Sequence, residues 1–245
     1  MLSNAIENRS RNVCVLTGAG ISADSGLATF RDANGLWEGH RVEDVATPEA
    51  WIRSPEIVWK FYQARRAQLA QVQPNAAHYA LFVLERYLEA GPGSFTLITQ
   101  NVDDLHQRSG STVLAMHGQL TQFQCERCHH RIEDRSHFNP NEFRPCENCQ
   151  FHRMRPDIVW FGEMPYYLDE IEAAMQRCTD FVAIGTSGLV YPAAGLLTQA
   201  RFRGARTWVI TLDPPVNLDS RDQYMRGRAA EAVPRWLDQE FPGLL

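Results

Sequence analysis

The sequence predicts an α/β fold: a Rossmann-like, doubly wound parallel sheet with a small inserted part that binds zinc and is otherwise helical. Short apolar segments of strand length alternate with amphipathic segments of helical period, which is typical of a parallel sheet covered by helices on both faces. A Gly-Ala-Gly turn follows the first apolar segment. A polar stretch with four cysteines interrupts the alternation, and we interpret it as an insertion.

The length of 245 residues suits one large domain with a small insertion. We expect the Rossmann-like part to comprise about residues 1–34, 76–121 and 156–245. The small part should comprise about residues 35–75, which are predicted to be mainly helical, and 122–155, which hold the cysteines.

Composition narrows the class of protein. Hydrophobic residues make up 44% of the chain and charged residues 22%, as in an ordinary globular enzyme. The formal net charge of -5 provides no basic field, so direct binding of nucleic acid is not expected. The first residues contain no apolar signal segment, and no window approaches 18 continuous apolar residues. We therefore expect a cytoplasmic protein without a membrane span.

Strands and helices are predicted from apolar runs and from the residues that begin and end them. Ser54 and Asn75 are candidate N-caps, and Gly91 ends the helix that Asn75 begins. The expected helices are 55–70, 75–91, 167–178, 193–203 and 229–240. The expected strands are 13–17, 95–99, 112–116, 157–161 and 207–212, and residues 181–187 are expected to form a strand followed by a turn.

Four cysteines have the spacing of a closed metal site. Cys125 and Cys128 form one Cys-x-x-Cys pair, Cys146 and Cys149 form another, and 17 residues separate the pairs. Four thiolates fill a zinc tetrahedron and leave no position for a water, so one structural Zn²⁺ is expected. Two alternatives are reduced cysteines without metal and a site in which His129 or His130 replaces a cysteine.

The turn after the first strand could bind a phosphate. Residues 18–23, Gly-Ala-Gly-Ile-Ser-Ala, fit the loose dinucleotide pattern, in which glycines let main-chain amides approach a pyrophosphate at a helix N-terminus. A plain strand–helix turn would have the same sequence. The turn alone would also fit a dehydrogenase that transfers hydride.

Several further blocks share one family pattern. They are GAGISADSGLATFRD at 18–32, Gln100-Asn101-Val102-Asp103, His117-Gly118, Gly185-Thr186-Ser187, and the zinc cysteines between His117 and Trp160-Phe161-Gly162-Glu163. In this order, the blocks resemble the signature of the sirtuin family, and the compact spacing resembles a bacterial member. The resemblance covers about residues 13–234.

The resemblance implies a single catalytic domain over 1–245, with NAD and an acyl-lysine protein or peptide bound in the cleft between its two parts. It also implies the reaction of an NAD-dependent protein-lysine deacylase. The acyl group is transferred to ADP-ribose, and the products are free lysine, nicotinamide and O-acyl-ADP-ribose.

The resemblance also implies roles for individual residues. His117 is the expected general base, because an imidazole titrates near neutral pH. Asn101 and Asp103 are expected at the nicotinamide pocket, and a turn-forming role is the alternative for both. Sirtuins usually have Asn where Thr211 stands, which puts the affinity for NAD in doubt. The expected NAD-binding residues are Gly18, Ala19, Gly20, Ser22, Phe30, Arg31, Gln100, Asn101, Asp103, Gly185, Thr186, Ser187, Thr211 and Ala229.

Substrate residues are expected in two groups. A peptide should add as a strand between two segments, and the residues expected there are Val159, Phe161, Gly162, Glu163, Gly188 and Val190. Tyr62 and Arg65 lie three apart on one predicted helix and resemble the Tyr-x-x-Arg pair of desuccinylase-type sirtuins. Ala33 also resembles the small residue that widens the acyl pocket in those sirtuins. We therefore expect removal of succinyl and malonyl as well as acetyl groups. A surface Arg beside a packed Tyr is the alternative.

Two further functions would use the same cleft. One is a mono-ADP-ribosyltransferase, and the other is a catalytically silent reader of NAD or peptide. The intact set of His117, Asn101 and Asp103 argues against the silent reader.

Overall fold

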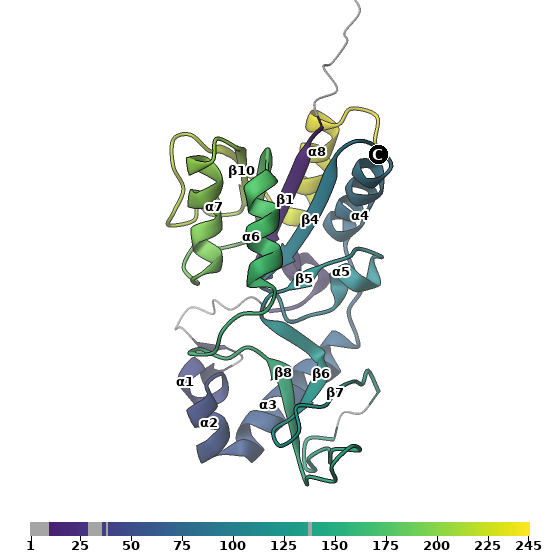
Figure 1. Cartoon of the computed structure of the whole chain (residues 1–245), viewed down its shortest axis with the longest axis vertical. Helices are drawn as coiled ribbons and strands as arrows, with labels where there is room; N and C mark the ends of the chain where they lie inside the picture. Colours follow the sequence, from purple (N-terminus) through teal and green to yellow (C-terminus); the bar gives the residue numbers. More distant parts are fainter. Residues whose placement is uncertain (1–9, 29–35, 38, 137–138) are drawn as a thin grey trace, which may run out of the picture.

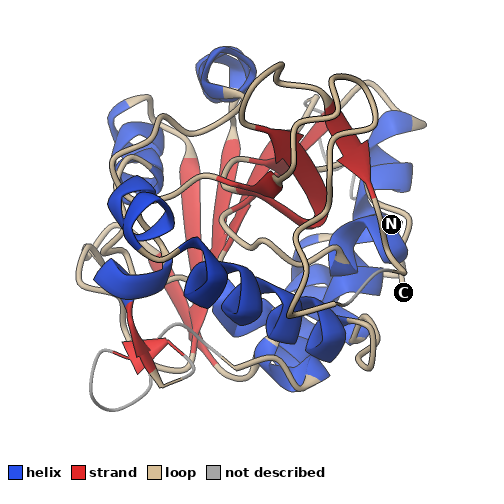
Figure 2. Cartoon of the chain, turned by 90° about the horizontal axis from the view of Figure 1, so that it is seen from below, coloured by secondary structure: helices blue, strands red, loops and turns tan. Residues whose placement is uncertain are grey.

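The computed structural model describes residues 10–28, 36–37, 39–136 and 139–245. The molecule is elongated, with a parallel sheet and its helices in the upper half of Figure 1 and a smaller sheet with its own helices in the lower half. Figure 2 looks along the long axis and shows helices on opposite sides of the strands. None of the described helices is both long enough and apolar enough to cross a membrane.

The larger sheet has six parallel strands in the order β11-β10-β9-β1-β4-β5. The chain passes from β1 to β4 on one side, and β9 later adds on the other side of β1. Doubly wound sheets bind ligands at the carboxyl ends of the strands where the order reverses in this way. The strand bounds are β1 Asn12–Thr17, β4 Ser94–Thr99, β5 Leu114–Ala115, β9 Asp180–Ile184, β10 Arg206–Thr211 and β11 Gln223–Arg226.

Both faces of this sheet are buried under helices. Val13, Val15 and Leu97 belong to the core beneath α4 and α8, whereas Cys14 and Ile98 belong to the core beneath α6 and α7. This alternation along each strand explains why the strand sequences are continuously apolar. The helix bounds are α4 Ala76–Glu89, α6 Leu168–Arg177, α7 Ala193–Phe202 and α8 Ala229–Glu240.

The lower half contains a three-stranded antiparallel sheet in the order β7-β6-β8. Its core is aromatic, with Trp51, Trp59, Phe123 and Trp160 all buried. The elements are α1 Val42–Val45, α2 Pro48–Arg53, α3 Pro55–Leu69, β6 Gly118–Cys125, β7 Arg131–Glu133 and β8 Met154–Ile158. Five smaller elements complete the described chain: β2 Leu36–Trp37, β3 His40–Arg41, α5 Leu105–Arg108, and the 3₁₀ turns η1 Ala19–Ile21 and η2 Ala23–Ser25.

The structure confirms the predicted fold class and the five helices predicted by residue range, with shifts of one or two residues at some ends. The predicted strand 157–161 is wrong in part. Strand β8 ends at Ile158 and pairs antiparallel with β6, so it belongs to the small sheet. The described chain after the Gly-Ala-Gly turn also forms two short 3₁₀ turns up to Ser25 instead of the expected helix.

The predicted division into two parts remains a prediction. Strand β6 crosses its boundary at 121/122, and β8 crosses the one at 155/156. The two parts are therefore joined through continuous strands as well as through loops.

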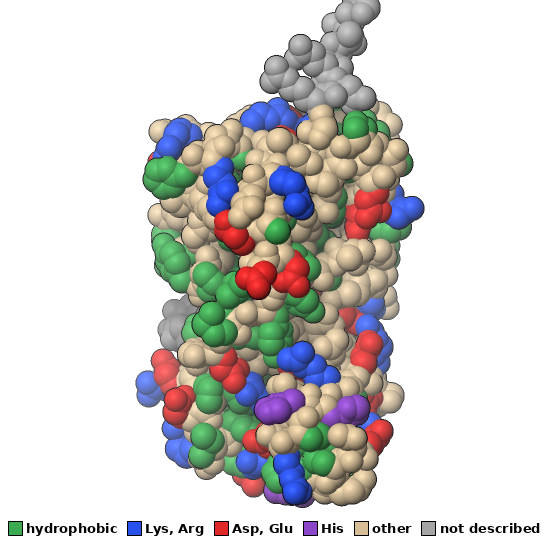
Figure 3. Space-filling view, viewed as in Figure 1, with side chains coloured by type: hydrophobic (Ala, Val, Ile, Leu, Met, Phe, Trp, Pro, Cys, Tyr) green, Lys and Arg blue, Asp and Glu red, His purple; other side chains and the backbone are tan. Residues whose placement is uncertain are grey.

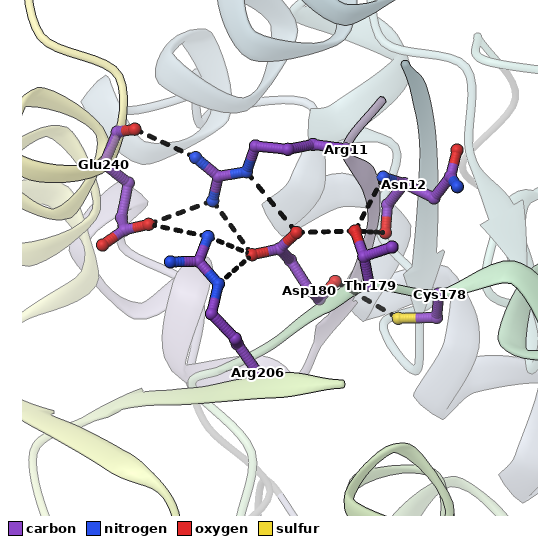
Figure 4. Close-up of polar contacts among 7 residues, drawn as sticks. All are labelled: Arg11, Asn12, Cys178, Thr179, Asp180, Arg206 and Glu240. Carbon is purple, nitrogen blue, oxygen red and sulfur yellow. Dashed lines mark hydrogen bonds and ion pairs between the residues drawn. The ribbon is translucent and has the colours of Figure 1, made fainter. Parts of the chain in front are cut away.

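A buried ion-pair network joins the amino-terminal ends of three sheet strands to the end of α8 (Figure 4). Asp180, which is 2% exposed, accepts hydrogen bonds from Arg11 at 3.0 Å and from Arg206 Nε at 2.9 Å. Glu240 binds the same two guanidinium groups, at 3.0 and 3.1 Å. Burial opposes ionisation of Asp180, but a hydrogen bond from Thr179 and the two arginines hold its pKa below the ordinary value.

We predict that Asp180→Asn lowers the free energy of unfolding by about 3 kcal/mol at pH 7, because Arg11 and Arg206 lose the buried carboxylate that they share. The difference from the wild type should shrink as the pH falls below about 4. Folding lowers the pKa of Asp180, so the ionised carboxylate stabilises the folded state. This contribution is lost as the carboxylate becomes protonated at low pH. Chemical denaturation at several pH values measures both effects.

Glu89→Gln is the matched control, because Glu89 forms an exposed ion pair with Arg86 on the surface of α4. An equal loss in both variants would mean that burial of the Asp180 network contributes nothing.

Candidate active site and zinc site

The four predicted zinc ligands lie together at one end of the small sheet. Cys125 Sγ and Cys149 Sγ are 3.6 Å apart, as are Cys128 Sγ and Cys146 Sγ, and all four sulfurs lie within 4.8 Å of one another. A tetrahedral ion with Zn–S bonds of about 2.3 Å requires S···S distances of about 3.8 Å, so the four thiolates fit zinc.

Hydrogen bonds also prepare the sulfurs for a cation. The main-chain amide of Arg127 donates to Cys125 Sγ at 3.4 Å, and the Asn148 side chain donates to Cys128 Sγ at 3.6 Å. The Asn148 bond leads the effects that lower the pKa of Cys128 to about 6. His129 and His130 are exposed and lie outside the cluster of four cysteines, so the alternative with a histidine ligand is wrong.

A cavity of about 790 Å³ lies at the carboxyl ends of the parallel strands and extends to the small sheet and α3. On the face seen in Figure 3, apolar side chains gather at mid-height, between the two halves of the molecule. Of the residues predicted to bind NAD or substrate that the structure describes, Gly188 alone does not line the cavity. Phe30, Arg31 and Ala33 lie outside the described residues.

The loops after β1 and β9 meet backbone to backbone at the base of the cavity. A Cβ atom on Gly18 would lie 2.8 Å from Gly185 O, and one on Gly20 would lie 2.7 Å from Gly185 Cα. Gly20 N–H donates to Gly185 O, and Gly18 N–H donates to Ile184 O, both at 2.9 Å. Both amides therefore donate to main-chain oxygens of the protein itself. The two glycines allow the loops to pack closely, because a side chain at either position would overlap with Gly185.

Asn101, Ser22 and Asp103 form a continuous hydrogen-bonded chain beside these loops. Asn101 Nδ2 donates to Gly18 O at 3.2 Å and to Ser22 Oγ at 3.1 Å, and Ser22 Oγ donates to Asp103 Oδ2 at 2.9 Å. Burial raises the pKa of Asp103, and hydrogen bonds from Leu105 N–H and Ser22 offset only part of that effect. The chain fixes an amide and a carboxyl group, both lining the cavity, relative to each other.

His117 directly precedes β6 and lines the same cavity. Its Nδ1 lies 2.9 Å from Gln100 O. A carbonyl can only accept, so Nδ1 carries the proton and Nε2 is the nitrogen that can act as a base. Burial lowers the pKa of His117, although the Gln100 bond opposes the shift, and the ring is therefore neutral at neutral pH. Val159 N–H donates to His117 O at 2.9 Å, which joins the histidine to the segment after β8.

The two residues predicted for acyl selectivity both line the cavity from α3. Tyr62 is fully buried, and its hydroxyl accepts a hydrogen bond from Trp160 Nε1 at 2.9 Å. Burial raises the pKa of this phenol. Arg65 is 8% exposed, which contradicts the alternative of a surface arginine.

The segment after β8 is held in place by an ion pair. Arg155 binds the carboxylate of Glu163 at 2.6 and 2.9 Å, and the same carboxylate accepts from Trp160 N–H at 2.8 Å. Glu163 lines the cavity, but its oxygens are used to shape the segment from Trp160 onward.

Sequence analysis gave no role to Asp24, which lines the opposite end of the cavity. Its carboxylate accepts from Arg228 Nη1 at 2.9 Å and from Ala230 N–H at 3.1 Å, so it caps the start of α8. The separation of 206 residues left no signal in the sequence. Thr211 Oγ1 donates to Asp213 O at 2.7 Å, so its hydroxyl hydrogen is already used within the protein.

Comparison with known proteins agrees with this class of fold and site. The model of the Sir2 family matches residues 18–192, and the chain belongs to this family, the sirtuins. A protein of Rhodopirellula baltica named NAD-dependent protein deacylase is 50% identical over 234 residues, which cover 93% of this chain and 98% of the relative. A Salmonella typhimurium protein of the same name is 48% identical over 236 residues, covering 95% and 85%.

Solved structures give the same result. The crystal structure of a Sir2 homologue in complex with NAD matches with a TM-score of 0.86 at 36% identity, covering 95% of this chain and 90% of that one. The structure of Sir2Af2 bound to a myristoylated histone peptide matches with a TM-score of 0.72 at 30% identity, covering 94% and 91%.

We predict about one zinc per chain in the purified protein, and a loss of both metal and soluble yield in Cys125→Ser, because three thiolates and a hydroxyl bind zinc weakly and binding supports folding. Metal analysis of matched preparations measures the loss. His130→Gln, next to the same knuckle, should keep its zinc. A metal-free wild type with full stability would contradict the structural role of the ion.

Proposed function

We propose that this chain is an NAD-dependent protein-lysine deacylase. The observation that carries the proposal is the position of His117 in the cavity, with Nδ1–H bound to Gln100 O and Nε2 left as a base. Asn101 and Asp103 line the same cavity, at the carboxyl end of the neighbouring strand β4. Relatives that share about half of their residues with this chain are named for the same activity.

The residues suggest a division of roles. NAD supplies the ADP-ribose that accepts the acyl group when nicotinamide leaves. Asn101 and Asp103 bind the nicotinamide end through an amide and a carboxyl group whose positions are fixed through Ser22. His117 Nε2 removes a proton from a ribose hydroxyl, and the low pKa of the ring keeps that nitrogen unprotonated near neutral pH.

The remaining NAD-binding residues follow from the position of the cavity. We propose that Gly18, Ala19, Gly20, Gln100 and the segment 185–187 contact the diphosphate and ribose, with Phe30 and Arg31 as further contacts. Thr211 and Ala229 would border the adenosine. Because its hydroxyl already donates to Asp213 O, Thr211 would offer a ribose only an acceptor, in keeping with a modest affinity for NAD.

The acyl-lysine peptide would enter between the segment after β8 and the segment 188–190 and add as a strand. Phe161 and Leu189 are 47% and 56% exposed and lie at the cavity, which supports an apolar entrance for the lysine stem and its neighbours. Strand addition uses main-chain groups and implies broad peptide specificity. Cytoplasmic location remains a prediction, supported by six cysteines without a disulfide.

We further propose that the acyl pocket accepts succinyl and malonyl groups. Tyr62 and Arg65 line the cavity next to Trp160, on the side away from the strand ends. Arg65 is 8% exposed, and a guanidinium shielded from water in this way can form strong charge-assisted hydrogen bonds with a substrate carboxylate. Ala33 would leave room for the longer acyl chain.

One experiment distinguishes the deacylase from the mono-ADP-ribosyltransferase and from the silent reader. The protein is mixed with NAD and an acylated peptide, and the products are identified by mass spectrometry. Acyl loss with O-acyl-ADP-ribose supports the deacylase. A protein that gains ADP-ribose supports the mono-ADP-ribosyltransferase, and the absence of any product would support a silent reader.

In this assay we predict that His117→Ala lowers kcat by about 100-fold or more while the fold survives, because the deprotonating group is lost. Circular dichroism and zinc content check the fold. His152→Gln changes an exposed histidine on the small sheet's side and should retain wild-type turnover. Normal turnover by His117→Ala would remove His117 from the role of base.

For Arg65→Met we predict a selective loss of turnover on succinyl-peptide, mainly through a higher KM, because the lost contact lies away from the bond that breaks. A charge-assisted hydrogen bond of about 2 kcal/mol corresponds to a factor of about 30. Turnover of the matched acetyl-peptide should persist, because acetyl has no carboxylate.

Lys60→Met is the control for this variant, since it removes an exposed positive charge from the same helix. Equal losses on the two peptides in Arg65→Met would leave Arg65 with a structural role.

A further inference from the structure

Two buried threonine hydroxyls lie directly behind the nicotinamide end of the cavity. Thr17 and Thr99 are the last residues of β1 and β4 and are register partners in the sheet. Their exposed fractions are 0% and 1%, and Thr17 Oγ1 donates to Thr99 Oγ1 at 2.8 Å. Val15 and Leu97, on the same sheet face, contact the apolar core under α4. The polar pair therefore replaces apolar packing at the ends of the two strands.

The hydroxyl pair is bonded to the loop that carries Asn101. Asn101 N–H donates to Thr99 Oγ1 at 3.1 Å. Asn101 Nδ2 donates to Gly18 O, and Gly18 directly follows Thr17. The two threonines thus fix the main chain next to both Asn101 and Gly18, the two residues joined by this hydrogen bond.

A histidine pair lies behind the hydroxyls. His106 Nε2 lies 3.0 Å from Thr17 Oγ1. Because Thr17 gives its hydrogen to Thr99, it accepts from His106, and His106 Nδ1 is then an acceptor. His78 Nδ1 accepts from Asn75 N–H at 3.3 Å, so its Nε2 is a donor.

The two rings are in contact. Their centroids are 4.8 Å apart, and within the described residues neither His78 Nε2 nor His106 Nδ1 has a hydrogen-bond partner. Burial lowers the pKa of His78 to about 4 and that of His106 well below its ordinary value, so both rings are neutral. A neutral, fully buried pair can hold a fixed tautomer and hence a fixed direction of hydrogen bonding.

The same histidine pair reaches the loop after β1 from the other side. Asn75, which bonds His78, also donates from Nδ2 to Ile21 O at 2.8 Å and to Ser25 Oγ at 2.9 Å. The turns η1 and η2 and the end of β4 are therefore attached to a single buried polar cluster.

We propose that Thr17 and Thr99, supported by His106 and His78, are positioning residues that hold Asn101 against Gly18 for binding of the nicotinamide carboxamide. The inference deepens the proposed deacylase function and rests on it. None of the four side chains lines the cavity, so their effect on the reaction is exerted through Asn101. A displacement of about 1 Å at such a residue can cost as much as 100-fold in rate.

The test replaces the hydroxyl with a methyl group in Thr99→Val and, independently, in Thr17→Val, with shape and strand preference retained. We expect nicotinamide release to slow by about tenfold in kcat, and the concentration of nicotinamide needed for half inhibition to rise by a similar factor. The KM for the acyl-peptide should change less than twofold, since Asn101 is placed at the nicotinamide end.

Two matched variants separate positioning from general stability. Thr99→Ser keeps the hydroxyl and should return activity to within about twofold of the wild type. Thr96→Val changes a half-buried threonine of the same strand that points to the opposite face, and it should behave as the wild type. Loss of activity in either variant, or unchanged kcat and nicotinamide inhibition in both Thr99→Val and Thr17→Val, would overturn the inference.

Amide hydrogen exchange tests the hydrogen-bonded cluster without any turnover. In Thr99→Val, exchange at the Asn101 amide should accelerate about tenfold, because its acceptor is gone. The neighbouring Gln100 amide donates to the main-chain oxygen of Thr17 at 2.9 Å and should keep its protection. A wild type that releases no nicotinamide would end the deacylase proposal, whereas unchanged exchange at Asn101 would end the positioning inference.

Discussion

The backbone contact between the loops after β1 and β9 is the constraint on which the rest of the site depends. Gly185 has a φ of +61°, and a Cβ on Gly18 or Gly20 would overlap with it. The close approach brings the ends of two neighbouring strands together, and Asn101 then bonds across to Gly18. A side chain at these glycine positions would separate the loops and displace the base of the cavity.

Residues of both halves of the molecule complete the cavity. His117 bonds Gln100, which follows a strand of the parallel sheet, and its own carbonyl accepts from Val159 next to the small sheet. Tyr62 on α3 bonds Trp160 in a similar way. The proposed base therefore lies where the two halves meet, and its orientation depends on both.

The sequence was sufficient for the fold class, the five longest helices and the clustering of the four cysteines, because these depend on local period and spacing. Most of the proposed site residues follow strand ends, and the reversal of strand order brings them together. The small sheet was mostly missed, because β6 has a mixed sequence, Gly-Gln-Leu-Thr-Gln-Phe-Gln-Cys, that resembles no continuous apolar run. Asp24 and the Thr17–Thr99 pair could not be found, because their partners are distant in sequence and a single threonine or aspartate carries no pattern.

Strand β6 begins immediately after His117 and ends at Cys125, so one continuous strand connects the proposed base to the first zinc ligand. The remote end of this strand carries a cysteine of the proposed zinc site and packs against the aromatic core of the small sheet. Occupancy of the cysteine cluster would thus be a condition for catalytic competence, even though the ion takes no part in the chemistry. Removal of zinc would thus disturb the position of the proposed base as well as the stability of the small sheet, although the parallel sheet that borders the rest of the cavity contains none of the four cysteines.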